Sequence, residues 1–119
     1  MKNALVPALA LGGLLFVFPM PRLDGHAILL STVPASNETI HGGEVHVQLR
    51  FNARIDAKRS RIILVLPDGK DRLLATDQPS PGLLTSEVSG LLPGSYILQW
   101  QVLAEDGHMT RGQLPFREQ

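Results

Sequence analysis

Alternation of apolar and polar residues is the dominant pattern of this chain after residue 25. It is clearest in residues 44–51 and 95–103, where every second residue is apolar or aromatic. Because successive side chains of a strand point to opposite faces, each segment is predicted to be a strand with one face in the core, and Trp100 to be the centre of that core. The predicted core-facing residues are Val45, Val47, Leu49, Phe51, Tyr96, Leu98, Trp100 and Val102.

Shorter apolar runs separated by turn residues predict further strands. The run that ends before Pro67-Asp68-Gly69-Lys70 is expected to form a hairpin with the segment after that turn. No long helical periodicity and no internal repeat is present. About seven short strands with Pro and Gly between them favour one all-β domain, a Greek-key β-barrel or sandwich of the immunoglobulin-like or cupredoxin-like kind. These further strands are predicted at residues 26–31, 61–66, 71–76, 83–88 and 113–116.

Residues 92–96, with the sequence Leu-Pro-Gly-Ser-Tyr, have two interpretations. A Tyr just after a Gly-containing bend at the start of a strand is the placement of a tyrosine corner, whose hydroxyl bonds to nearby backbone in Greek-key proteins. The same residues also fit an ordinary turn followed by a core Tyr. Both interpretations agree with the all-β fold.

Residues 1–25 have the composition of a secretory signal peptide. A positive start is followed by an apolar run over residues 4–18, which is shorter than the ~20 residues that span a bilayer. Gly25 is a small residue immediately before His26, as a signal peptidase requires. We therefore expect cleavage before His26 and a single exported domain at residues 26–119, whereas an uncleaved anchor or a cut elsewhere is the alternative.

The expected mature chain has little net charge and no thiol. The full chain has formal net charge +0 and no cysteine, and removing Lys2, Arg22 and Asp24 leaves about −1. Scattered charge of both signs excludes a nucleic-acid-binding surface and a polybasic membrane patch. Without Cys, metal ligands must come from His, Met, carboxylate or backbone groups. No phosphate-binding loop, serine nucleophile elbow or zinc-protease helix is present, so no catalytic residue is assigned.

The four histidines have different contexts. His46 lies on the polar face of the predicted 44–51 strand and is expected to be solvated. His41 precedes two glycines in a turn, where it is either a solvent-exposed loop residue or a weak auxiliary ligand. His108 ends the triplet Asp106-Gly107-His108, whose Asp-Gly pair is typical of a type I′ hairpin turn. In an extended or bulged backbone Asp106 and His108 also project to the same side, where they can bind one ion.

His26 supplies the donors that this pair lacks. As the first mature residue it offers its α-amine and its imidazole, which close a small chelate ring on one metal ion. Together with Asp106 and His108 it gives three nitrogen ligands and one oxygen ligand, the set that Cu(II) prefers. The only mature methionine is Met109, so the sequence predicts one Cu(II) per chain and no soft Cu(I) site.

Most of residues 26–119 resembles the periplasmic copper-resistance proteins of the CopC family. The resemblance rests on the opening at residues 26–35 and the strand at residues 45–51, and then on Gly94-Ser95-Tyr96, Trp100-Gln101-Val102 and Asp106-Gly107-His108 with Gly112 and Phe116 behind. It implies a Greek-key β-barrel whose Cu(II) is held by the first mature residue and the Asp-Gly-His triplet. Those positions are His26, Asp106 and His108 here.

The resemblance also implies a cellular role. Family members with a second, Cu(I) site carry a methionine-rich loop that this chain lacks, so only the Cu(II) site is expected. The implied location is the periplasm, the implied role is copper resistance or homeostasis by binding and delivery without turnover, and the implied partner is an inner-membrane CopD-type copper transporter. The mature chain itself is not expected to span the membrane.

Two other functions fit parts of the pattern. Copper mono-oxygenases that act on polysaccharides also begin with a metal-binding histidine, but the few aromatic residues here are predicted to lie in the core, which leaves no platform for a sugar. A metal-free immunoglobulin-like structural or adhesion module is the third interpretation. Reductant-driven oxidation of a polysaccharide or production of peroxide tests the mono-oxygenase, and the absence of Cu(II) binding by the processed protein would favour the metal-free module.

Overall fold

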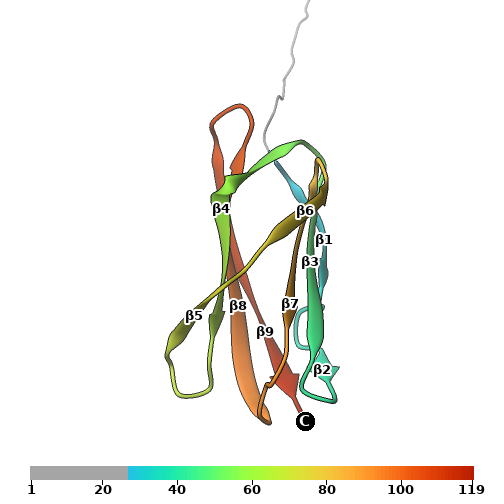
Figure 1. Ribbon diagram of the computed structural model, residues 1–119, viewed down its shortest axis with the longest axis vertical. Helices are drawn as coiled ribbons and strands as arrows, with labels where there is room; N and C mark the ends of the chain where they lie inside the picture. Colours follow the sequence, from blue (N-terminus) through green and yellow to red (C-terminus); the bar gives the residue numbers. More distant parts are fainter. Residues whose placement is uncertain (1–26) are drawn as a thin grey trace, which may run out of the picture.

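The computed structural model describes residues 27–119, which form nine strands in two facing sheets (Figure 1). One sheet has the order β1-β3-β7-β6 and the other β2-β9-β8-β4-β5. Within this part of the chain no helix has the length and hydropathy needed to cross a membrane. The strands are β1 (Leu29–Val33), β2 (Thr39–Ile40), β3 (Val45–Phe51), β4 (Ile55–Val65), β5 (Asp71–Leu74), β6 (Asp77–Ser80), β7 (Leu83–Val88), β8 (Gly94–Ala104) and β9 (Met109–Glu118).

The core lies between the two sheets and is made by the alternating positions of their strands. All eight residues predicted to face the core from β3 and β8 are buried, which confirms the two alternating patterns. Trp100 of β8 lies directly opposite Gly112 of β9, and a Cβ atom at residue 112 would come within 2.4 Å of the Trp100 ring. Glycine at position 112 therefore makes room for the indole, because any side chain there would displace it.

The all-β Greek-key prediction is confirmed, with two more strands than expected among the described residues. β2 has only two residues, and β6 is exposed throughout, so neither carries an apolar alternation that the sequence could reveal. β4 begins at Ile55, six residues earlier than predicted, because its first part contains an irregularity between Asp56 and Arg61. The first strand is β1, Leu29–Val33, rather than residues 26–31. The predicted signal peptide and His26 lie outside the described residues.

Tyr96 forms a tyrosine corner. Its hydroxyl donates a hydrogen bond to the backbone carbonyl of Leu92, with 2.6 Å between the two oxygens. The ring stacks on Phe116 of β9, with 5.4 Å between ring centroids. Of the two interpretations of residues 92–96, the structure supports the tyrosine corner.

The two ends of the sandwich carry different connections. The β8–β9 hairpin and the start of β1 lie at one end, whereas the β4–β5 turn and the C-terminus lie at the other (Figure 1). The strand pairings agree, because Ala104 at the end of β8 pairs with Ile55, whereas Ile97 near its beginning pairs with Val65. The end with the β8–β9 hairpin is called the hairpin end below.

Candidate metal centre

The Asp106-Gly107-His108 triplet lies in the hairpin that joins β8 to β9. The hairpin closes with hydrogen bonds from the Gly107 amide to the Ala104 carbonyl, 2.9 Å, and from the Ala104 amide to the His108 carbonyl, 2.8 Å. Gly107 has a positive φ of 94°, whereas Asp106 does not have a positive φ. This is a three-residue loop with glycine in the left-handed position. The predicted turn is therefore present, but its expected type I′ geometry is wrong, since that geometry needs positive φ at both residues.

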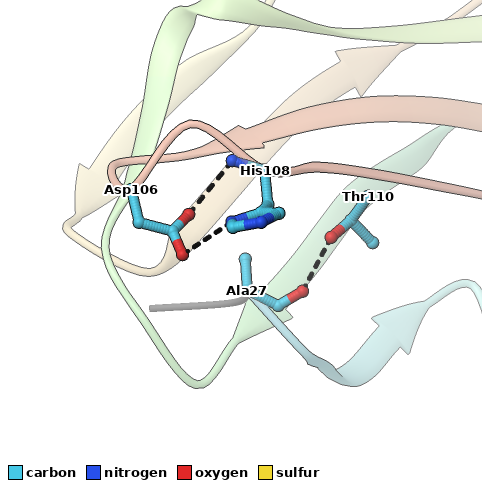
Figure 2. Close-up of polar contacts among 4 residues, drawn as sticks. All are labelled: Ala27, Asp106, His108 and Thr110. Carbon is cyan, nitrogen blue, oxygen red and sulfur yellow. Dashed lines mark hydrogen bonds and ion pairs between the residues drawn. The ribbon is translucent and has the colours of Figure 1, made fainter. Parts of the chain in front are cut away.

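Asp106 and His108 meet on one side of this loop, as their spacing predicts. One carboxylate oxygen of Asp106, Oδ1, accepts a hydrogen bond from the His108 amide at 3.1 Å, and the other, Oδ2, lies 2.9 Å from the imidazole Nδ1 (Figure 2). The Asp106 side chain is 28% exposed and that of His108 is 60% exposed. The carboxylate thus fixes both the backbone and the ring of His108 at a surface that water and ions can reach.

The beginning of the described chain is attached next to this loop. The Ala27 carbonyl accepts a hydrogen bond of 2.9 Å from the Thr110 hydroxyl, two residues after His108 (Figure 2). Ile28 is held by Asn52, whose side chain accepts from the Ile28 amide at 2.8 Å and whose amide donates to the Ile28 carbonyl at 3.0 Å. Ala27 itself is 3% exposed. Three hydrogen bonds therefore hold residues 27 and 28 at the hairpin end.

Thr110 and Asn52 are positioning residues that the sequence did not reveal. Thr110 occupies an inward-facing position of β9, where the alternation of the strand leads one to expect an apolar residue. A polar residue at such a position is the sequence signal that could have identified it. Asn52 follows β3 directly and has the composition of an ordinary turn residue. Their partners lie 83 and 24 positions away, so only the folded chain shows what they hold.

The hairpin has one further support on its other flank. Glu105 forms an ion pair with Arg54, with 3.3 Å between Nε of Arg54 and Oε2 of Glu105. The Glu105 amide also donates a hydrogen bond to the Arg54 carbonyl at 3.2 Å. Both side chains are more than half exposed, so the ion pair contributes little to stability. Its effect is to join the hairpin to the segment that precedes β4.

His41 and His46 lie away from this loop. The His41 ring is 3.0 Å from the backbone oxygen of Gln119, beside the C-terminal end of β9. About 30 Å of strand separates that end from His108, at ~3.3 Å per residue. His46 lies near the start of β3, half exposed, with its Nδ1 3.0 Å from Oε2 of Glu87 on β7. The structure therefore brings neither residue to the pair formed by Asp106 and His108.

The described residues supply part of a metal site. An imidazole and a carboxylate on one loop are suitable donors for Cu(II) or Zn(II). Within residues 27–119, however, no three His, Cys, Asp or Glu side chains gather as metal ligands would. A stable site on this loop needs further donors, and His26, which lies outside the described residues, directly precedes the tethered Ala27.

Comparisons with known proteins identify the family and the fold. A family model described as the CopC domain matches residues 29–119. Protein YobA of Escherichia coli strain K12 is 27% identical over 105 residues, which cover 81% of each chain. The crystal structure of CopC from Methylosinus trichosporium OB3b has a TM-score of 0.70 and 27% identity, covering 78% of this chain and 93% of that one. PcoC, a methionine-rich copper-resistance protein from Escherichia coli, has the same fold, with a TM-score of 0.61 at 20% identity over 79% and 99% of the two chains.

Proposed function

The chain belongs to the CopC family, and we propose that it is a periplasmic copper-resistance protein that binds one Cu(II). The ligands in this proposal are the α-amine and imidazole of His26, the imidazole of His108 and the carboxylate of Asp106. The similarity to CopC and PcoC supports copper as the metal. The particular ligands follow from the residues of this chain.

The observation that carries the proposal is the hydrogen bond between Ala27 and Thr110. It attaches the chain to β9 two residues after His108. Because consecutive Cα atoms are 3.80 Å apart, the attachment of Ala27 supports our choice of the preceding residue in the sequence, His26, as a ligand. In this proposal, cleavage before His26 makes both its new α-amine and its imidazole ligands of the same ion.

The donor types favour Cu(II) over Cu(I). Three nitrogens and one oxygen match the tetragonal preference of Cu(II), whereas Cu(I) prefers thiolate and thioether sulfur. PcoC is described as methionine-rich. The present chain has no Cys and three Met in all, of which only Met109 lies in the part of the chain that the structure describes.

The proposed role is to buffer Cu(II) in the periplasm and to deliver it to a partner, for which an inner-membrane CopD-type transporter is our candidate. Binding and release require no chemical turnover. The aromatic residues between 27 and 119 do not offer a surface for stacking on a polysaccharide, since Phe51, Tyr96, Trp100 and Phe116 are all buried. No observation therefore favours the mono-oxygenase alternative.

A fluorescence titration tests the proposal. Trp100 is the single tryptophan of the chain, and its partner Gly112 lies two residues after Thr110, about 7 Å along β9. Cu(II) bound at the hairpin end should therefore quench Trp100 emission, with saturation at one ion per chain. The affinity should fall as the pH is lowered, because protons compete with the metal for the amine and the imidazoles.

The matched control is the same protein with the α-amine of His26 acetylated. Acetylation removes the amine as a donor and should weaken Cu(II) binding at least ~100-fold, because one bidentate ligand becomes monodentate. The copper electron paramagnetic resonance spectrum should change as well. Equal affinity and identical spectra for the two proteins would disprove the role of the N-terminus.

A further inference from the structure

In the folded chain, basic and acidic residues are unevenly distributed between the two ends of the sandwich. Among residues 27–119, basic side chains predominate at the hairpin end and acidic side chains at the opposite end, although the net charge is small. The strand registers place Arg50, Arg54, Lys58, Arg59, Arg61 and Arg111 with Asp56, Glu105 and Asp106 at the hairpin end. Asp77, opposite Thr85, lies level with the middle of β3. Glu38, Glu44, Asp68, Asp71, Glu87 and Glu118 lie at the other end with Lys70, Arg72 and Arg117.

Two of these arginines form a row across the outer face of the five-stranded sheet. Arg61 of β4 and Arg111 of β9 are both cross-strand partners of Gln101, which lies between them on β8. At ~4.8 Å between neighbouring strands, the Cα atoms of the two arginines are about 10 Å apart. Arg61 donates to the Gln101 side-chain oxygen at 3.3 Å. We call Arg61, Gln101 and Arg111 the arginine row.

Unlike Arg54 and Arg59, the two arginines of the arginine row have no carboxylate partner within the described chain. Arg54 and Arg59 are paired with Glu105 and Asp56, whereas neither Arg61 nor Arg111 forms an ion pair among residues 27–119. Both are exposed. Beside the row lies an open groove of about 310 Å³, whose lining includes Ile63, Gln99, Gln101, Arg111, Gly112 and Gln113.

We propose that the arginine row is a docking surface for an acidic segment of a partner protein. Two arginines whose Cα atoms lie about 10 Å apart can each bind a carboxylate with two parallel hydrogen bonds. The amides of Gln99, Gln101 and Gln113 add neutral donors and acceptors along the adjoining groove. A partner seated there lies at the end of the sandwich that carries Asp106 and His108. The acidic opposite end repels the same partner, so the charge separation also selects the direction of approach.

An acidic protein segment fits this surface better than an anionic membrane does. Adsorption to anionic lipid uses clusters of roughly four to eight basic residues, whereas the row has two. Of the other basic residues at this end within residues 27–119, Arg54 and Arg59 are paired with carboxylates and Arg50 lies on the other sheet, which leaves Lys58 as the one further basic residue of this sheet. A sheet face with the Gln101 amide between two arginines suits the planar carboxylates of Asp and Glu. The inference does not require copper, so it can fail or succeed independently of the proposed function.

The test is a nuclear magnetic resonance titration of the metal-free protein with an octaglutamate peptide at low salt. Amide shifts should centre on residues 61, 101 and 111 and their neighbours, and they should diminish as salt is added. Arg61→Gln and Arg111→Gln should each weaken binding roughly two- to fivefold, the range for exposed ion pairs. The double variant should lose about tenfold if the two sites are nearly independent.

Arg117→Gln is the matched control, because Arg117 lies on the same face of β9 at the opposite end. It should change the affinity less than about twofold. Equal losses for Arg111→Gln and Arg117→Gln, or shifts centred at the opposite end, would overturn the proposal, as would no binding. Sedimentation of the protein with phosphatidylglycerol vesicles but no response to the peptide would replace the protein partner with a membrane.

Discussion

Residues 27–119 contain the same hairpin loop at two places, and only one of them is a candidate metal centre. The β4–β5 loop closes with bonds from the Gly69 amide to the Leu66 carbonyl and from the Leu66 amide to the Lys70 carbonyl, both 2.8 Å. Its glycine has φ 89°, and the Asp68 carboxylate accepts from the Lys70 amide at 2.9 Å. The β8–β9 loop repeats each of these features at Ala104 to His108.

Two differences between the loops bear on metal binding, namely the residue that ends the triplet and the residues around the loop. The residue that ends the triplet is Lys70 in one loop and His108 in the other. Around the β4–β5 loop a groove of about 320 Å³ is lined mainly by apolar residues that include Leu66, Leu91 and Leu92, whereas the β8–β9 loop adjoins Thr110 and the tethered Ala27. The β8–β9 loop thus brings two donors together, and we expect the surrounding chain to decide whether they bind a metal ion.

The largest expected effect comes from removing the ring that distinguishes the loops. His108→Ala should weaken Cu(II) binding more than ~100-fold, beyond the 10–100-fold typical of losing a residue that only supports a ligand. Lys70→Ala in the other loop and His46→Ala on β3 should leave binding nearly unchanged. The Trp100 titration measures all three. Retained high affinity in His108→Ala would show that the β8–β9 loop is not the site.

A smaller loss of Cu(II) affinity is expected from a change at Thr110, which lies next to the β8–β9 loop and not in it. Thr110→Val keeps the shape of the side chain but removes the hydroxyl that holds Ala27. We expect about tenfold weaker Cu(II) binding, in the range of supporting residues, and about 1 kcal/mol lower stability in urea denaturation.

Thr85→Val is the matched control, since the Thr85 hydroxyl also donates to a backbone carbonyl, that of Asp77, in the other sheet. It should lower the free energy of unfolding without altering copper binding. A Thr110→Val protein that binds copper like the parent would show that the tether does not position the N-terminus.

The glycines of the two loops, Gly69 and Gly107, allow a paired comparison in which the expected change in Cu(II) affinity is smaller still. Gly69→Ala and Gly107→Ala meet no neighbouring atom within 4 Å, so the cost of each comes from the positive φ alone, about 1 kcal/mol. Equal losses of unfolding free energy are expected in thermal denaturation. Only Gly107→Ala should also weaken Cu(II) binding, by a fewfold, because it disturbs the loop that holds the donors. A copper effect of equal size in Gly69→Ala would remove the distinction between the loops.

The smallest expected effect is the sharpest test of the comparison. Lys70→His creates a second Asp-Gly-His triplet in the same loop geometry but away from Thr110 and Ala27. The titration should still saturate at one Cu(II) per chain with unchanged affinity, because a carboxylate and one imidazole do not make a stable site alone. A second ion of comparable affinity would show that the triplet suffices without the N-terminus.

Local pattern explains which parts of the fold could be predicted. The alternation in β3 and β8 identifies their buried faces because side-chain direction repeats every two residues. The same rule fails for β2 and β6, which are too short or too exposed to alternate. For the Asp-Gly pair, the sequence indicated a turn but the wrong type, since the register of β8 with β9, in which Leu103 pairs with Met109, leaves room for a longer loop than type I′.

The residues of the candidate site likewise divide into those that the sequence could predict and those that it could not. Asp106 and His108 could be paired from sequence because two positions separate them. Thr110, Asn52 and the arginine row could not, because their partners are distant in sequence and are chosen by strand register. The ligand role of His26 remains a prediction from the sequence, supported by the placement of Ala27.

The sequence by itself determined which faces of the strands are buried and which donor types are available, since both depend on the identity and spacing of nearby residues. Only the tertiary structure decided that Ala27 lies beside Thr110 across 83 positions, and that an almost neutral chain has a basic and an acidic end. The physical reason is that strand pairing and interstrand hydrogen bonds join residues without regard to their separation in sequence.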